Sequence, residues 1–203
     1  MVLDNLRYFA TLARHVPGLP AGQYVRGFDS VMRREPVGVC GCVAPWNYPL
    51  AMAVWKLGPA LAAGNCLVLK PADTTPVTTS RLAEIIGEHR PVGVFNVVIG
   101  DRDTGRALLR NALVDLVSVT GSVAAGRRSP QAPRRASSVF NSISGQGTGS
   151  GVPDADLDVA AEGIAAAAFM NAGQDRAAAT RVLASSVDCR RAHQCACGAG
   201  RQH

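Results

Sequence analysis

The sequence predicts an α/β protein with a mostly parallel sheet and flanking helices, on two observations. From residue 37 onward, short apolar runs of strand length alternate with longer segments of helical period, which is the pattern of a parallel sheet covered by helices. The apolar fraction, 47% of 203 residues, is ordinary for a globular protein with a buried core. A chain of this length has room for one domain and a small appendage.

The first part of the chain predicts a helix and a ribbon before the sheet begins. Residues 4–15 place apolar side chains at a helical spacing, and Gly18 and Pro20 end that helix. Residues 24–34 alternate less regularly and predict an extended ribbon. The run at residues 37–43 is rich in valine and predicts a buried strand.

An alternation of helices and strands follows. In the first helix Trp55 and Leu57 are among the side chains expected to face inward, and Gly64 ends that helix. Helices are predicted at residues 49–63, 79–88 and 104–112, and strands at residues 66–70, 94–98 and 116–119.

Order is expected to weaken in residues 127–151, which are rich in Ser, Gly, Arg, Pro and Gln and show hardly any apolar period. Asp156 or Asp158 is then expected to cap a helix that runs through Ala172, because carboxylates near a helix start stabilise it. The chain is expected to finish with one strand at residues 179–184 and a patternless tail at residues 185–203.

The formal net charge of +6 comes largely from clustered arginines. A basic patch can indicate nucleic-acid binding, but only Phe140 supplies an aromatic side chain near these clusters and no recognition motif accompanies them. We therefore favour a solvated basic segment and expect no nucleic-acid partner. The clusters are Arg127, Arg128, Arg134 and Arg135 in the irregular segment, and Arg190, Arg191 and Arg201 in the tail.

The six cysteines fall into two sets. Cys40, Cys42 and Cys66 lie in strand-like apolar runs, where free cysteine behaves as a small hydrophobic residue. The second set lies in the tail, and zinc binds such residues, but the spacing matches no common finger and we expect no metal site. The tail residues are Cys189, His193, Cys195, Cys197 and His203.

No apolar stretch approaches the roughly 20 residues that span a bilayer. The first 18 residues carry scattered charges and have no unbroken apolar core of a signal peptide. We therefore expect a cytoplasmic protein with no membrane partner.

Three predicted strand ends carry residues suited to binding a ligand. They are Pro45-Trp46-Asn47, Lys70-Pro-Ala-Asp73 and Thr120-Gly121-Ser122. In open parallel sheets ligands bind beyond the carboxyl ends of the strands. The chain has no Gly-x-Gly-x-x-Gly fingerprint of ordinary dinucleotide-binding folds.

The residues around these strand ends resemble the aldehyde dehydrogenase superfamily. A single Thr-Gly-Ser would be a weak signal, but many blocks in the family's order are specific. They are Arg34-Glu-Pro-Val-Gly-Val39, Ala44-Pro-Trp-Asn-Tyr-Pro-Leu50, Trp55-Lys-Leu-Gly-Pro-Ala-Leu-Ala-Ala-Gly-Asn65, Val68-Leu-Lys-Pro-Ala-Asp73, Gly93-Val-Phe-Asn-Val-Val98, Val119-Thr-Gly-Ser122 and Asn171-Ala-Gly-Gln174. Gly173-Gln-Asp175 and Ala179-Thr-Arg-Val182 resemble the aminoaldehyde or betaine-aldehyde branch.

The resemblance implies a partial Rossmann-like cofactor domain of the aldehyde dehydrogenase fold, incomplete at its N-terminal side. It implies NAD or NADP as cofactor, a small aldehyde as substrate, and an oligomer whose contacts are largely missing here. On this basis residues 1–126 form the cofactor-binding domain, and residues 152–184 form a helix and the start of the catalytic domain.

The resemblance also assigns roles to individual residues. Asn47 matches an oxyanion-hole amide, although its spacing alone fits a turn residue. Lys70 matches a lysine that hydrogen-bonds the adenosine ribose, although it could equally be a surface lysine. Asp73 stands where the family has a glutamate, and is one methylene shorter. The remaining cofactor residues are Trp46, Gly100 beside the adenine, and Gly121 and Ser122 at the pyrophosphate.

Two departures from the family pattern remove its chemistry. The family attacks the aldehyde with a cysteine thiolate, passes hydride to the nicotinamide and releases the acyl group with activated water. Arg176 occupies the nucleophile position, and a guanidinium is not a nucleophile. The general base should lie between Gly126 and Pro153, where no glutamate occurs. We therefore expect an inactive chain.

The replacement segment suggests a displaced reading frame. Residues 137–145 can be back-translated so that the frame one base earlier reads Lys-Arg-Val-Gln-Leu-Asp-Leu-Gly, which resembles the family's general-base block. We hypothesise a frame-displaced stretch at residues 127–151 and a second at residues 185–203. The alternative function is a non-catalytic dinucleotide- or partner-binding module.

Overall fold

The computed structural model describes residues 1–15, 21–121, 139–142, 147–150, 156–175 and 178–183. The chain divides into two compact units, Met1–Ser142 and Ile143–His203. The two units are described separately below.

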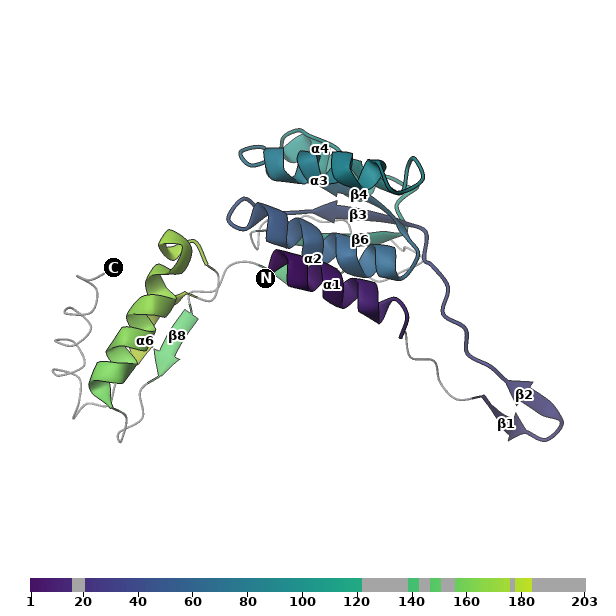
Figure 1. Cartoon of the computed structure of the whole chain (residues 1–203), viewed down its shortest axis with the longest axis horizontal. Coiled ribbons are helices and arrows are strands. Elements are labelled where there is room, and N and C mark those ends of the chain that lie inside the picture. Colours follow the sequence, from purple (N-terminus) through teal and green to yellow (C-terminus); the bar gives the residue numbers. More distant parts are fainter. Residues whose placement is uncertain (16–20, 122–138, 143–146, 151–155, 176–177, 184–203) are drawn as a thin grey trace. The chain divides into compact units, whose positions relative to one another are not determined.

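The first unit contains a five-stranded sheet in which every strand is parallel to its neighbours (Figure 1). The strand order is β5-β4-β3-β6-β7, so the chain moves outward in one direction from β3 to β5 and then crosses to the other side. This order and the flanking helices confirm the predicted α/β class. The strands are β3 (Val39–Val43), β4 (Cys66–Lys70), β5 (Phe95–Val97), β6 (Leu116–Gly121) and β7 (Val139–Ser142).

Three helices connect these strands and cover both faces of the sheet. They are α2 (Pro49–Ala62), α3 (Val77–Gly87) and α4 (Arg102–Arg110). One core cluster joins α2 to side chains of β3 and β4, including Cys40, Leu57 and Leu69, and α3 packs against it. A second cluster joins Leu109 of α4 to Val117 and neighbouring residues on the opposite face. The strands are therefore apolar on both faces, as buried parallel strands are.

The entry to β3 is held by two side chains from elsewhere in the chain. The Oδ1 atom of Asn65, which is 7% exposed, accepts hydrogen bonds from the amides of Val37 and Gly38 at 2.7 and 3.1 Å, and its Nδ2 donates to the carbonyl of Ala60 at 3.2 Å. The Oδ2 atom of Asp115 accepts from the amide of Val39 at 2.9 Å. These bonds fix β3 against both of its neighbours.

The part of the chain before the sheet forms a helix and a hairpin. Helix α1 (Val2–Leu12) lies along α2 (Figure 1), and the ring of Phe9 occupies the space that a side chain at Gly58 would need. The expected extended ribbon is an antiparallel pair, β1 (Gly22–Val25) and β2 (Phe28–Ser30).

The second unit contains a helix and a two-stranded parallel sheet, β8 (Gly147–Ser150) with β9 (Ala179–Leu183). Asp156 caps helix α6 (Leu157–Phe169), because its Oδ1 accepts from the amides of Asp158 and Val159 at 3.0 and 3.3 Å. Of the two candidates, Asp156 is therefore the N-cap residue of α6.

The prediction that this helix runs through Ala172 is wrong. The α-helix ends at Phe169, and a short 3₁₀ turn, Met170–Gly173, follows. Asn171 and Ala172 have φ values of 52° and 56°. Two residues in the left-handed region cannot continue a right-handed helix.

The prediction of weak order in residues 127–151 does not hold for residues 139–142 and 147–150. These residues form two short strands, β7 and β8. Parallel pairing joins backbone groups of each strand to a partner, so it does not require the periodic apolar pattern that the sequence lacks. The arginine clusters at residues 127–135 and the cysteines and histidines of the tail lie outside the described residues.

Candidate functional site

The carboxyl ends of the parallel strands meet at one edge of the sheet, and most of the predicted site residues lie there. Trp46 and Asn47 follow β3, Lys70 ends β4, and Gly121 ends β6. The strand order reverses between β3 and β6, which is the point where open α/β sheets bind ligands. Ser122 and Arg176 lie outside the described residues.

Asn47 and Trp46 lie in the bend between β3 and α2. Trp46 is 52% exposed, whereas Asn47 is half-buried. Pro49 occupies the first turn of α2, where its missing N–H is not needed. The bend therefore presents both side chains beyond the end of β3.

Lys70 is buried although it ends a strand at the edge of the site. Only 6% of the residue is exposed, and a Cβ atom at Gly105 of α4 would lie 3.8 Å from its Cδ. Its stem thus runs between β4 and α4. Within the described part of the chain, its ammonium has no hydrogen-bond or ion-pair partner, so the group is available to a ligand.

Asp73 is exposed, and its carboxylate is turned toward its own turn. Its Oδ1 accepts a hydrogen bond from the amide of Thr74 at 3.1 Å. The carboxylate therefore already has a local partner.

Gly100 belongs to the start of α4. Asp101 caps that helix by accepting from the amides of Asp103 and Thr104 at 2.9 and 3.1 Å, and the bonds from Thr104 and Asp103 hold the pKa of Asp101 below its usual range. A side chain at Gly100 would collide with Thr104. The glycine is therefore required by the packing of this helix start.

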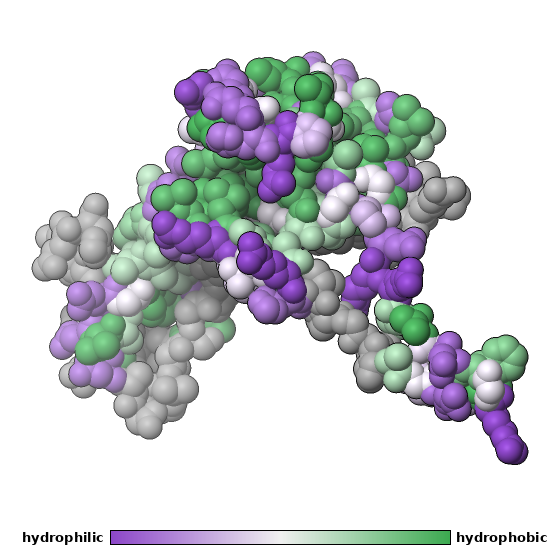
Figure 2. Space-filling view, turned by 45° about the vertical axis from the view of Figure 1, so that its right-hand side comes forward, coloured by the Kyte–Doolittle hydropathy of each residue, from purple (hydrophilic) through white to green (hydrophobic). Residues whose placement is uncertain are grey.

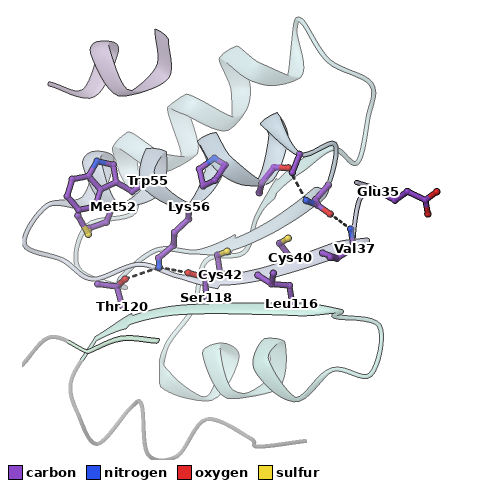
Figure 3. Close-up of a pocket in the computed structure, with 14 residues that line it drawn as sticks. Glu35, Val37, Cys40, Cys42, Met52, Trp55, Lys56, Leu116, Ser118 and Thr120 are labelled. Atoms are coloured by element: carbon purple, nitrogen blue, oxygen red, sulfur yellow. Dashed lines mark hydrogen bonds between the residues drawn. The ribbon is translucent and has the colours of Figure 1, made fainter. Parts of the chain in front are cut away.

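The sequence interpretation missed Lys56 and the cavity beside it (Figure 3). A cavity of about 370 Å³ lies between α2 and the strands β3 and β6, and its lining includes Cys40, Cys42 and Met52. Lys56 is 6% exposed, and its Nζ donates to Ser118 Oγ at 3.0 Å and to Thr120 Oγ1 at 2.8 Å.

The apolar pattern of α2 gave no sign of this buried lysine. Trp55, which was expected to face inward, is 42% exposed, whereas Leu57 is buried as expected. A lysine within a helix ordinarily faces solvent. The hydroxyls of Ser118 and Thr120, brought close by the parallel pairing of β6 with β3, accept hydrogen bonds from Lys56 and favour its burial.

The thiols in the cavity are poor nucleophiles. Burial raises the pKa of Cys42 to about 12, although the nearby Lys56 acts in the opposite direction. Burial, and then the charge of Asp115, raises the pKa of Cys40. Both groups are therefore protonated at neutral pH, and the thiolate is the reactive form. Cys66 is exposed but begins β4, at the opposite edge of the sheet from Lys70.

The described residues contain neither a candidate membrane span nor a candidate metal cluster. None of the helices there is long and apolar enough to cross a membrane. Nor does that part of the chain contain a group of three or more His, Cys, Asp or Glu side chains that could hold a metal ion.

The fold and the residues at the strand ends place this chain among the open parallel α/β proteins with a Rossmann-like sheet. The family model described as "Aldehyde dehydrogenase family" matches residues 1–188. The chain therefore belongs to the aldehyde dehydrogenase family, as the sequence blocks predicted.

Individual relatives agree with this assignment. Betaine aldehyde dehydrogenase of Bacillus subtilis (strain 168) is 39% identical over 185 residues, which cover 90% of this chain and 38% of that protein. Phenylacetaldehyde dehydrogenase of Pseudomonas fluorescens is 44% identical over 186 residues, which cover 87% of this chain and 37% of that protein. This chain thus spans about two fifths of the length of these relatives.

A solved structure shows the same fold. NAD-dependent aldehyde dehydrogenase from Sinorhizobium meliloti matches with a TM-score of 0.91 and 33% identity, over 99% of this chain and 41% of that one. An aldehyde dehydrogenase from Bacillus cereus, solved as an NAD⁺ complex, matches with a TM-score of 0.89 and 31% identity, over 96% of this chain and 40% of that one.

Proposed function

We propose that this chain binds a nicotinamide dinucleotide at the carboxyl edge of its sheet and does not oxidise aldehydes by itself. The observation that carries the proposal is a mismatch between two sets of residues. The residues that match the family's cofactor contacts lie together at the sheet edge, while the nucleophile position holds Arg176.

The residues at the edge fit a dinucleotide. The ammonium of Lys70 has a buried stem and no partner within the described residues, so it is free to donate to a ribose hydroxyl. Asn47 and Gly121 lie at the ends of the two strands on either side of the switch point. The solved relatives from Sinorhizobium meliloti and Bacillus cereus are described as an NAD-dependent enzyme and an NAD⁺ complex. When bound, the dinucleotide would supply the hydride acceptor.

The chain's own residues do not supply the covalent step. A guanidinium has no lone pair available for attack on a carbonyl carbon at neutral pH. Cys40 and Cys42 are buried thiols with raised pKa values, so neither replaces the missing thiolate. No glutamate lies between Gly126 and Pro153 to activate water. The side chain of Asn47 would therefore have no oxyanion to stabilise.

The substrate class follows only from the family. The relatives act, by their names, on betaine aldehyde, phenylacetaldehyde, geranial and retinaldehyde. An aldehyde of small or moderate size is thus the compound to offer in a test of turnover, and betaine aldehyde is one choice.

Binding and turnover can be measured on the same purified chain. Titration with NADH should give a saturable change in nicotinamide fluorescence, and incubation with aldehyde and NAD⁺ or NADP⁺ should produce no reduced nicotinamide beyond a control without protein. Absence of saturable binding would contradict the first half of the proposal. Sustained turnover that is not removed by further purification would contradict the second half.

Binding of a protein partner is a second candidate function, favoured by the β1–β2 hairpin. Its large apolar side chains lie at the surface, where Figure 2 shows hydrophobic and hydrophilic residues side by side at the right-hand end of the view. Exposed apolar residues on a two-stranded ribbon with free edges are suited to pairing with another sheet. Size-exclusion chromatography with light scattering tests this candidate. An oligomer that dissociates into monomers when Tyr24 and Phe28 are replaced by serine would support it. A wild-type chain that is already monomeric would contradict it.

A further inference from the structure

We propose that Lys56 captures apolar aldehydes as a covalent imine in the cavity between α2 and the strands β3 and β6. The ligand class is an aromatic or medium-chain aldehyde without a charged group. The reaction is reversible and transfers no hydride. It therefore neither requires the dinucleotide nor replaces the oxidation chemistry that the chain lacks.

The chain uses lysine at two positions, and both are buried. These lysines are Lys56 and Lys70, whereas the many other cationic side chains of this kind are arginines. Each of the two lysines is 6% exposed. Because a guanidinium is not a nucleophile, the reactive amines of the side chains are confined to the interior. Of the two, Lys56 lines the cavity, and Lys70 ends β4.

The side chain of Lys56 reaches from α2 to strand β6 (Figure 3). Its Nζ donates to Ser118 Oγ at 3.0 Å and to Thr120 Oγ1 at 2.8 Å, and both of these acceptors are neutral. The carboxylate among the described lining residues belongs to Glu35, which is exposed and points away from Lys56 in Figure 3. A lysine desolvated in an apolar pocket is the kind of amine that attacks carbonyl groups to form Schiff bases.

The cavity has the size and the lining for an apolar carbonyl compound. Its volume is about 370 Å³, which lies within the range of about 300–1,000 Å³ that is usual for small-molecule sites. Cys40, Cys42, Met52 and Trp55 give it apolar and polarisable walls. Since the pKa of each of the two thiols is raised, neither thiol competes with Lys56 for the carbonyl carbon. A cationic aldehyde fits poorly, because burying its charge is costly.

The reaction balances without an oxidant. The neutral Nζ of Lys56 attacks the carbonyl carbon, a C–N bond forms, and one proton moves from nitrogen to the carbonyl oxygen to give a carbinolamine. The hydroxyls of Ser118 and Thr120 lie within hydrogen-bond distance of Nζ and can pass this proton. The C–O bond then breaks, and the oxygen leaves as water with both amine protons. The imine is at the oxidation level of the aldehyde and hydrolyses back on dilution, which distinguishes it from an acyl adduct.

Reductive trapping on the full chain tests this inference. Benzaldehyde with sodium cyanoborohydride converts an imine into a stable benzylamine, which peptide mass spectrometry assigns to a residue. At limiting aldehyde Lys56 should carry at least about tenfold more label than Lys70, and the labelling of Lys56 should saturate. Lys70 is the internal control, because it is equally buried but lies outside the cavity lining. The same reaction in urea is the second control, and there the two lysines should label alike.

A variant and two further ligands define the site. Lys56→Arg keeps a cation that can donate to the same hydroxyls and should lose the label at this position, while circular dichroism reports on the fold. Benzyl alcohol, which lacks the carbonyl, should protect Lys56 from benzaldehyde. Betaine aldehyde should label Lys56 at least about tenfold less than benzaldehyde does, because its cation would be buried.

The wild-type chain decides the outcome even if Lys56→Arg does not fold. Absence of label at Lys56, equal labelling of Lys56 and Lys70 in the folded chain, or labelling that benzyl alcohol does not reduce would overturn the inference. Saturable label at Lys56 in a chain that binds no NADH would support the inference and contradict the proposed dinucleotide function.

Discussion

Asn65→Ala should destabilise the chain by about 2–3 kcal/mol, because one buried side chain holds the entry to β3. The wild-type amide makes three hydrogen bonds, at 2.7, 3.1 and 3.2 Å, to Val37, Gly38 and Ala60. Each such bond contributes about 1 kcal/mol, and a buried group left unpaired costs more. Val37 is exposed and Gly38 is half-buried, so water can reach their amides, which keeps the total near the sum of the three bonds.

Urea unfolding followed by circular dichroism measures this loss. With a slope of about 2–3 kcal/mol per molar urea, the midpoint should fall by about 1 M. Asn111→Ala is the matched control, because the Oδ1 of Asn111 accepts one bond, from the amide of Leu113 at 2.9 Å, in an exposed turn. That variant should lose about 0.5 kcal/mol or less. Equal losses in the two variants, or an Asn65→Ala midpoint at the wild-type value, would refute the role given to Asn65.

Four further predictions concern the packing of α1 on α2, the buried thiol of Cys42, the exposed thiol of Cys66 and the reading frame of residues 137–145. Gly58→Ala should lower the free energy of unfolding by about 1–3 kcal/mol, because the Phe9 ring must move. In a double-mutant cycle, Phe9→Ala should then cost less stability in the Gly58→Ala variant than in the wild type. Additive losses would contradict the contact. The free energy of unfolding should fall as the pH rises from about 8.5 to about 12, because the thiol of Cys42 ionises in the unfolded chain from about pH 8.5 but in the folded chain only near pH 12. Cys42→Ala should flatten this dependence. An unchanged slope in that variant would exclude Cys42 as its source. Among the described cysteines, Cys66 should react first with a maleimide, as mass spectrometry of peptides would show. Sequencing the gene should find codons for residues 137–145 that read as the general-base block in the frame one base earlier, and incompatible codons would remove the frame hypothesis.

The alternating strands and helices from β3 to β6 were predictable, because the sequence pattern of each segment favours the same structure that its packing in the sheet requires. Strand β4 occupies the predicted residues, and the ends of β3, β5, β6, α2, α3 and α4 differ from prediction by at most two residues. In these segments the apolar period, the glycine and asparagine at the end of α2, and the burial on both faces all favour one structure. The cap by Asp156 was predictable for the same reason, since the side chain acts within its own turn.

The features that were missed depend on contacts distant in sequence. Strand β7 exists through pairing with β6, which the short run Val-Phe-Asn-Ser at residues 139–142 does not reveal. Lys56 is buried because hydroxyls from β6, more than sixty positions later, accept from it. The burial of the Lys70 stem likewise depends on where α4 packs. Motifs placed the candidate site at the strand ends, but only the packing showed which charges are engaged.

The proposal of binding without oxidation is tested most directly by mass spectrometry of the intact chain after incubation with an aldehyde and a dinucleotide. The expected result is an unmodified protein mass, together with saturable binding of the dinucleotide in the same preparation. A stoichiometric acyl adduct on any side chain would contradict the claim that the polypeptide lacks a functioning nucleophile.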